Sequence, residues 1–252
     1  RGAAVNVIEH VGATPLLIDV EEDTLNMSPT ALAAQMNPRV KAILVVHYAG
    51  HPVDLDAISS IARAHGVPII EDAAHALPAW EGDRIVGSRG NLTAYSFYAT
   101  KNITTCEGGM LTGPVELIDR ARILGLHGLS KDAAKRYEKG GSWRYEILAP
   151  GFKYNMTDLA AAIGRVQLRK LEGFQARRRE VVAAYDQAFT DIEWIRTPTE
   201  RPGYTSAQHL YPLRVSSNRD ATIDYLSERG IGASVHFIPI HLHPYYRDKY
   251  GF

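Results

Sequence analysis

The residues VPIIEDAA, 67–74, indicate the fold class, because they read as an apolar strand that ends in acidic side chains. Continuous apolar runs of this length are typical of strands that are buried on both faces, as in parallel sheets. The preceding stretch, DLDAISSIARAHG at 54–66, has the apolar period of a helix and ends at Gly66, a common helix stop. Another apolar run, VKAILVVHYAG at 40–50, comes before that helix. Strand, helix and strand in this order predict a parallel α/β fold.

The same alternation extends to both sides of this unit. Residues 13–20, ATPLLIDV, read as a strand, and residues 28–36 read as a helix with Ser28 as its N-cap. Residues 80–112 hold three short strand-like pieces, separated by Gly-Ser and Gly-Gly turns. We therefore expect a partly parallel sheet of roughly six or seven strands.

After Pro114 the pattern changes from this alternation to longer helical stretches. Residues 115–125 predict a helix, and the polar residues 132–146, which lack any apolar period, predict a surface loop. From Thr157 onward, the apolar positions recur at three and four residues for longer than most globular helices last. This long helix is expected to join two domains.

The chain is therefore expected to have three parts. Residues 1–156 form a large domain, residues 157–190 the connecting helix, and residues 191–252 the start of a smaller α+β domain. In the last part we expect a strand, a helix and a strand, at residues 209–216, 219–230 and 231–237.

The composition excludes several classes of protein. Of the 252 residues, 45% are hydrophobic and 22% are charged, as in an ordinary globular protein. Lys+Arg and Asp+Glu both number 28, so the balance of charge indicates neither a nucleic-acid partner nor an acidic membrane surface. Cys106 is the single cysteine, which rules out an internal disulfide framework. No apolar run approaches the roughly 20 residues of a membrane span, and we expect a cytoplasmic protein.

Three reactive side chains are expected where strands of this sheet end. Asp72 closes one strand, and Ser96 and Lys101 belong to SFYATKN, residues 96–102, after another. Open α/β sheets bind ligands at the carboxyl ends of their strands. A lysine that forms a Schiff base with pyridoxal phosphate needs an acidic partner for the pyridine nitrogen and donors for the phosphate. Asp72 and Ser96 could supply these, and His75 could donate to the phenolic oxygen of the ring.

Each of these residues also has a simpler explanation. Asp72 alone is better explained as the N-cap of a helix that begins in the following AAHA. Lys101 alone could be a surface lysine beyond the end of a strand. Their occurrence in order with Ser96 favours the cofactor site. Gly108 and Gly109, which follow the lysine, would let the backbone turn tightly behind it.

Three blocks of the chain resemble, in order, the signature blocks of the DegT/StrS-type sugar aminotransferases. They are IEDAAHA (70–76), YSFYATKNITTCEGGM (95–110) and GFKYNMTDLAAAIGRVQL (151–168). The forms SFYATKNIT and KYNMTD are most similar to the aminotransferases that make UDP-4-amino-4-deoxy-L-arabinose and related 4-amino sugars. The resemblance implies an α/β fold of the pyridoxal-phosphate transferase type I. Its large domain has a mixed, mostly parallel sheet flanked by helices, and a smaller α+β domain follows.

The resemblance also implies a role for each residue of the first two blocks. Lys101 matches the Schiff-base lysine, and Asp72 matches the partner of the pyridine nitrogen. His75 matches the position that holds Gln or His beside the ring, and Ser96 matches the phosphate-binding serine. The implied cofactor is pyridoxal 5'-phosphate.

The third block is implied to complete the active site of a second subunit across a homodimer interface. Many family members have Gly-x-Asn there, with the Asn reaching the phosphate of the neighbour. This chain has Lys153 at the Asn position and Asn155 two residues later, so either residue could make the contact. Asn155 could instead be an N-cap or make a turn contact before the long helix that follows.

Two histidines of VHFIPIH, His236 and His241, match a histidine-bearing loop that lies near the substrate in the family. Alternatively, His236 is a core residue on a strand and His241 is a surface loop residue. No Cys or acidic ligand accompanies them at a zinc-like spacing, so we discount a metal site. Cys106 lacks an identifiable partner base, and we expect a small packed residue rather than a nucleophile.

The activity implied by the resemblance is transamination. An amino group would pass from glutamate or glutamine to the keto group, at position 4, of a nucleotide-linked sugar, for lipopolysaccharide or antibiotic biosynthesis. Lys101 would be both covalent anchor and general acid/base.

Three other functions stay open: amination of a cyclitol or non-sugar ketone, a regulatory relative without turnover, and a plain nucleotide-binding module. The last of these predicts a GxGxxG loop, which this chain lacks.

We also expect the chain to be incomplete at both ends. Family members carry, upstream of the part that matches Arg1, a helix whose N-terminal N–H groups bind the phosphate. They also carry there an aromatic residue that stacks on the pyridine ring. Downstream, the small domain breaks off at Phe252 after about two of its expected elements.

Overall fold

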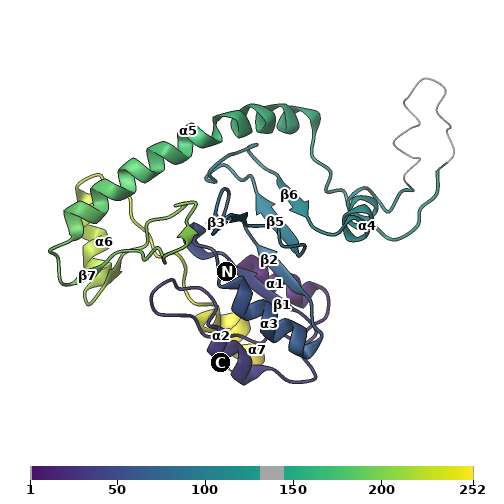
Figure 1. The fold of residues 1–252 in the computed structure, drawn as a ribbon, viewed down its shortest axis with the longest axis horizontal. Coiled ribbons are helices and arrows are strands. Elements are labelled where there is room, and N and C mark those ends of the chain that lie inside the picture. The colour runs from purple at the N-terminus through teal and green to yellow at the C-terminus, as the bar shows by residue number, and fades with distance from the viewer. Residues whose placement is uncertain (1, 131–144, 252) are drawn as a thin grey trace.

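The structure is a computed structural model that describes residues 2–130 and 145–251 of the chain. A central sheet is surrounded by helices, and one long helix, α5 (Asp158–Phe189), extends along one side of the molecule (Figure 1). The predicted surface loop at 132–146 falls almost entirely outside the described residues. Within the two described ranges, no helix is both long enough and apolar enough to cross a membrane.

The central sheet has four strands in the order β1, β2, β5 and β6. β1 (Ile43–Val46), β2 (Ile69–Asp72) and β5 (Leu92–Ser96) run parallel, and β6 (Gly109–Thr112) pairs antiparallel with β5. The prediction of a partly parallel sheet is confirmed. The predicted six or seven strands are too many, because the central sheet has four in the described part of the chain. Several apolar runs lack a hydrogen-bonded partner strand there.

Two smaller sheets lie outside the central one. β3 (Trp80–Glu81) and β4 (Arg84–Ile85) form an antiparallel pair, so residues 80–112 hold four short strands rather than three. β3 also pairs with β8 (Tyr204–Thr205), which brings a segment from far along the chain next to residues 80–81. A second antiparallel pair is formed by β7 (Ile195–Arg196) and β9 (Arg214–Val215). The strand predicted at 209–216 is therefore only two residues long.

Helices α2 (Pro29–Gln35) and α3 (Leu55–His65) confirm the two predicted helices, with the predicted N-cap at Ser28 and helix stop at Gly66. Ser28 Oγ and Asp54 Oδ1 accept hydrogen bonds from first-turn backbone N–H groups, at 3.3 and 2.9 Å. Gly66 ends α3 in the left-handed conformation, with φ of 64°. A buried cluster joins these helices to the sheet through Leu32, Ile43, Val45, Val53, Leu55, Ile58, Ala62 and Ile69. This core fixes where β1 and β2 end.

The strand predicted at 13–20 is wrong. This stretch follows α1 (Gly2–His10), and its ladder contact is a single bridge between Val20 and Met27. A strand needs a continuous partner for its backbone groups. The side chain of Leu16 is 49% exposed, while Ile18 is partly buried against the core, so the run contacts the core without pairing as a strand.

The helices predicted at 115–125 and from Thr157 onward are confirmed. They are α4 (Val115–Gly125) and α5 (Asp158–Phe189), and Thr157 Oγ1 caps α5 by accepting from a first-turn N–H at 3.2 Å. Most of α5 is exposed, and Gln175 is buried. A helix of 32 residues therefore lies beside the sheet with little cover from the described chain (Figure 1).

The last part of the chain returns to its beginning. The predicted helix at 219–230 is confirmed as α6 (Arg219–Glu228), but residues 231–237 form no strand, because they make no ladder in the described structure. α7 (Pro244–Tyr250) then packs on α1, where the Lys249 ammonium pairs with the carboxylate of Glu9.

Candidate active site

Asp72 and Ser96 lie at the same edge of the sheet. Each is the last residue of its strand, and the parallel register of β2 and β5 sets Asp72 beside Ala94. Asp72 is half-buried, and its Oδ1 accepts a hydrogen bond from the N–H of Ala74 at 3.0 Å. A turn follows Asp72, so the explanation of this residue as a helix N-cap is wrong. The carboxylate instead ends a buried strand at the edge where α/β sheets bind ligands.

Lys101 lies on a tight turn directly after β5. Its backbone N–H donates to the carbonyl oxygen of Tyr98 at 2.9 Å, and the Tyr98 N–H donates to Ser96 Oγ at 3.4 Å. Phe97 anchors this turn in the core, with 7% of its surface exposed. The far end of the turn is bonded back to its start, since the N–H of Thr105 donates to the carbonyl oxygen of Phe97 at 2.9 Å. The turn therefore holds the half-buried Lys101 close to the end of β5.

The expected tight turn behind the lysine is confirmed at Gly108. Its φ of +150° is one that residues with a side chain rarely adopt. A Cβ at this position would lie 2.5 Å from Oγ1 of Thr105. Gly109 then starts β6 opposite Ser96, so the two glycines bring the antiparallel strand back along β5.

His75 is buried under this edge of the sheet, with 2% of its surface exposed. Its ring centroid lies 4.2 Å from that of His209 and 5.7 Å from that of His236. His236 is half-buried and not on a strand, and its carbonyl oxygen accepts from Tyr48 Oη at 2.6 Å. The structure thus brings His75 and His236 together. His241 lies on η3 (Ile240–Leu242), with its side chain exposed.

Two residues that the sequence did not single out join this group. His209 Nδ1 lies 3.0 Å from Oδ1 of Asn102, the residue that follows Lys101. Asn102 Nδ2 in turn donates to the carbonyl oxygen of Ala207 at 2.7 Å. The position of Asn102 beside the lysine was a signal that could have found it. His209 carried no such signal, because only the fold brings it near residue 75.

Lys153 and Asn155 lie on the exposed segment before α5. The Lys153 ammonium donates to Oδ1 of Asn155, and both side chains are exposed. The phenyl ring of Phe152 stacks on the ring of Tyr154, with centroids 4.9 Å apart. Thr157 caps the long helix, so the explanation of Asn155 as its N-cap is wrong.

A buried hydrogen bond between two side chains supports the strand that carries Asp72. His47 Nε2 lies 3.0 Å from Oε2 of Glu71, and both side chains are fully buried. The N–H of Val53 donates to His47 Nδ1, so Nε2 must carry the proton that Glu71 accepts. Burial opposes ionisation of Glu71, but hydrogen bonds from His47 and Asn91 outweigh it and lower the pKa of Glu71. The neighbour of Asp72 is thereby a fixed buried carboxylate.

Cys106 is exposed, so the expectation of a packed residue is wrong. The tight turn causes this, because Cys106 has a φ of 68° while its N–H donates to Thr104 Oγ1 at 2.9 Å. No group of three His, Cys, Asp or Glu side chains in the described ranges is arranged to hold a metal ion.

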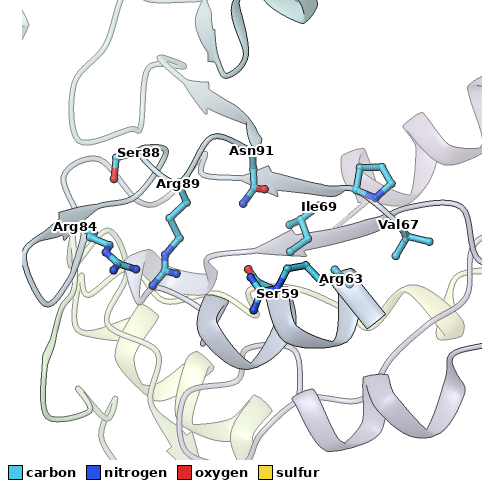
Figure 2. Close-up of a pocket in the computed structure, with 10 residues that line it drawn as sticks. Ser59, Arg63, Val67, Ile69, Arg84, Ser88, Arg89 and Asn91 are labelled. Carbon is cyan, nitrogen blue, oxygen red and sulfur yellow. The ribbon is translucent and has the colours of Figure 1, made fainter. Parts of the chain in front are cut away.

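A separate pocket of about 530 Å³ lies where β2 and β5 begin, which is the opposite edge of the sheet from Asp72. Figure 2 shows the side chains of Arg63, Arg84 and Arg89 around it. The guanidinium of Arg89 already pairs with Asp56 at 2.6 Å and with a second carboxylate. This pocket is therefore not part of the site around Lys101.

Comparison with known proteins identifies the family of the chain. The DegT/DnrJ/EryC1/StrS aminotransferase family matches residues 2–251. SpsC of Bacillus subtilis, a spore coat polysaccharide biosynthesis protein, is 47% identical over 99% of this chain. The chain spans 66% of the length of SpsC.

Two solved structures have the same fold. Spr1654 of Streptococcus pneumoniae, solved in PLP and PMP forms, matches in its PMP form with a TM-score of 0.91 and 33% identity, over 100% of this chain and 69% of that one. PseC of Helicobacter pylori, an aminotransferase involved in the biosynthesis of pseudoaminic acid, matches with a TM-score of 0.91 and 28% identity, over 99% and 66% of the two chains. The predicted fold class is confirmed, and the chain belongs to the DegT/DnrJ/EryC1/StrS aminotransferase family.

Proposed function

We propose that the protein is a pyridoxal-phosphate-dependent aminotransferase that moves an amino group from glutamate or glutamine to the keto group of a nucleotide-linked sugar. The observation that carries the proposal is the meeting of Asp72, Ser96 and Lys101 at one edge of the sheet. A carboxylate, a hydroxyl and an ammonium group are the three kinds of side chain that this cofactor requires. The family match and the PLP and PMP forms of Spr1654 support the same cofactor.

The residues of the site fit the cofactor in their chemistry. When bound, pyridoxal phosphate supplies an aldehyde that can carry the amino group and a ring that withdraws electrons from the reacting carbon. Asp72 would hold a proton at the ring nitrogen, and the Ser96 hydroxyl would donate to the phosphate. His75 would lie beside the ring. Lys101 would bind the aldehyde covalently and then move the proton at the reacting carbon as general acid/base.

A second copy of the chain is proposed to complete each site. Lys153 or Asn155 would reach the phosphate bound by the partner, since both are exposed and outside the group around Lys101. Large apolar side chains near them also face outward. Their exposed fractions are 70% for Ile147, 76% for Tyr154 and 80% for Leu159. Apolar surface of this kind marks protein interfaces, which supports a homodimer.

The sugar substrate is proposed from the relatives. SpsC is named for spore coat polysaccharide biosynthesis and PseC for pseudoaminic acid biosynthesis. We propose a 4-keto sugar, as for the enzymes that make UDP-4-amino-4-deoxy-L-arabinose, in a cytoplasmic pathway. His236 and His241 are the proposed substrate contacts. Amination of a cyclitol or a non-sugar ketone uses the same chemistry and is the second candidate.

The visible absorption of the purified, cofactor-loaded protein tests this function. The lysine-bound cofactor should give a visible band that is lost on adding glutamate or glutamine and returns with a suitable keto sugar. A panel of 3-keto and 4-keto nucleotide sugars, with a cyclitol ketone as comparison, identifies the acceptor. Absence of any visible band after the cofactor is supplied would overturn the proposal.

A further inference from the structure

Residues 206–210, which we name the strap, cross close to the candidate site and are fixed to the large domain. The N–H groups of Ala207 and His209 donate to the carbonyl oxygens of Gly50 and Ala49, both at 3.0 Å. Gly50 has a φ of +105°, and a Cβ there would lie 2.9 Å from a backbone nitrogen of the strap. Only a glycine allows so close an approach. The strap is therefore seated on the segment that follows β1.

The long helix α5 holds the strap from another side. Gln175 Nε2 donates to the carbonyl oxygen of Ser206 at 3.2 Å, and Arg178 Nη1 donates to that of Gln208 at 3.3 Å. Gln175 is 3% exposed, and burial lowers the pKa of Arg178. One buried and one half-buried side chain of α5 thus hold the backbone on either side of Ala207, next to His209.

Asn102 sets the protonation of the His209 ring. Its Nδ2 donates to the carbonyl oxygen of Ala207, which can only accept. Oδ1 of Asn102 therefore faces His209 Nδ1, 3.0 Å away, and accepts a hydrogen bond from its N–H. His209 thus carries a proton on Nδ1, and the plane of its ring is fixed by a buried amide. Asn102 is 7% exposed, so water competes little for this hydrogen bond.

The fixed ring of His209 lies against His75. The two centroids are 4.2 Å apart, and the ring planes are inclined by 38°. A side chain that is 2% exposed and packed on a fixed ring has few alternative rotamers. Asn102 thus ties the orientation of the His75 ring to the backbone of Lys101, the residue directly before it in the chain.

We propose that His209 is a positioning residue that, held by Asn102, fixes the His75 ring for the cofactor beside Lys101. The inference rests on the proposed function, because it names a support for that same site. His209 touches neither the reacting atoms nor the cofactor in this proposal. It acts through His75, so the loss of His209 should change the orientation of the His75 ring beside the cofactor.

Two substitutions test the ring of His209 and its hydrogen bond to Asn102 one at a time. His209→Phe keeps a ring against His75 but removes the donor to Asn102, and His209→Asn keeps a donor but removes the ring. In the cofactor-loaded protein, we expect both to shift the visible absorption band and to lower kcat about 10-fold, because small misplacements are costly. The KM for the amino donor should change by less than about twofold, since the donor does not touch this residue. His65→Asn, an exposed histidine at the end of α3, is the matched control.

A second measurement needs no activity. Proton–nitrogen NMR of cofactor-free protein with labelled histidine should show His209 protonated on Nδ1, and Asn102→Ala should remove that signal. His209 with its proton on Nε2 alone would overturn the inference. So would variants that lower the melting temperature but keep the wild-type absorption and kcat, because this is the result of packing alone. Failure of the wild type to bind the cofactor would instead overturn the proposed function.

Discussion

The two halves of the proposed active site are built in opposite ways. The half around Asp72, Ser96 and Lys101 lies on strand ends and a turn that are fixed by the core of the same chain. The half that contains Lys153 and Asn155 lies on an exposed segment, with outward-facing apolar side chains beside it. The first half has its geometry before any partner binds. Under the proposed function, the second half acts only when a partner subunit covers it.

The largest effect should come from the lysine of the first half. Lys101→Arg keeps a positive charge but cannot form the covalent bond or move the proton at neutral pH. We expect the glutamate half-reaction to fall by at least about 10³-fold, as measured by the loss of visible absorption in single-turnover experiments. Lys170→Arg on α5, where the side chain is exposed, is the control and should be unchanged. A Lys101→Arg protein that still turned over would remove Lys101 from its proposed role.

Mixed dimers test whether the second half serves a partner. Asn155→Ala should weaken cofactor binding by about 10- to 100-fold if it loses a hydrogen bond to phosphate, and Lys153→Ala shows which of the two residues makes the contact. Subunits carrying Lys101→Ala and subunits carrying Asn155→Ala should each be inactive at limiting cofactor. The two variants are mixed in equal amounts, unfolded and refolded, so that about half of the dimers contain one subunit of each kind. Each mixed dimer has one intact site of its two, so about a quarter of the wild-type activity should return. No recovery in verified mixed dimers would place both residues in the site of their own subunit.

The sequence could predict those parts of the fold that are held by residues close together in the chain. β1, α3 and β2 were predicted because their apolar residues form one local core, so that pattern and structure coincide. The apolar stretches 13–20 and 231–237 have the same local pattern but form no strand. A strand depends on its ladder partner, and no local pattern reports whether that partner is present.

For the site, the sequence predicted the residues that follow apolar strands, and the parallel register brings Asp72 and Ser96 to one edge. It did not predict Asn102 or His209. These two meet through a contact between positions 107 residues apart, which the path of the strap creates. Chemistry at the ends of strands is readable from sequence, whereas support from a distant segment requires the fold.

A medium effect is expected from the buried carboxylate next to Asp72. The pKa of Glu71 is lowered in the folded protein, so its ionised form stabilises the fold at pH values above the ordinary Glu pKa of about 4.3. This stabilisation is lost as the pH falls through the lowered pKa of the folded protein. Glu71→Gln should lower the free energy of unfolding by about 1–3 kcal/mol at pH 7, with a smaller difference below about pH 4. Urea unfolding at several pH values measures this. Glu180→Gln, in an exposed pair with Arg177, should cost less than about 0.5 kcal/mol at every pH. A Glu71→Gln difference that did not depend on pH would contradict the ionised state of Glu71.

The smallest expected effect concerns the turn that holds Lys101. Cys106 has a φ of 68°, which costs a residue with a side chain about 1–2 kcal/mol relative to glycine. Cys106→Gly should relieve this and, after the entropy that glycine loses on folding, raise the free energy of unfolding by roughly 0.5–1 kcal/mol. Cys106→Ser keeps the side chain and should leave stability unchanged in the same urea titration. Because the thiol is exposed, neither change should reduce the glutamate half-reaction. A loss of stability in Cys106→Gly would mean that the side chain contributes more to the turn than its backbone angle costs.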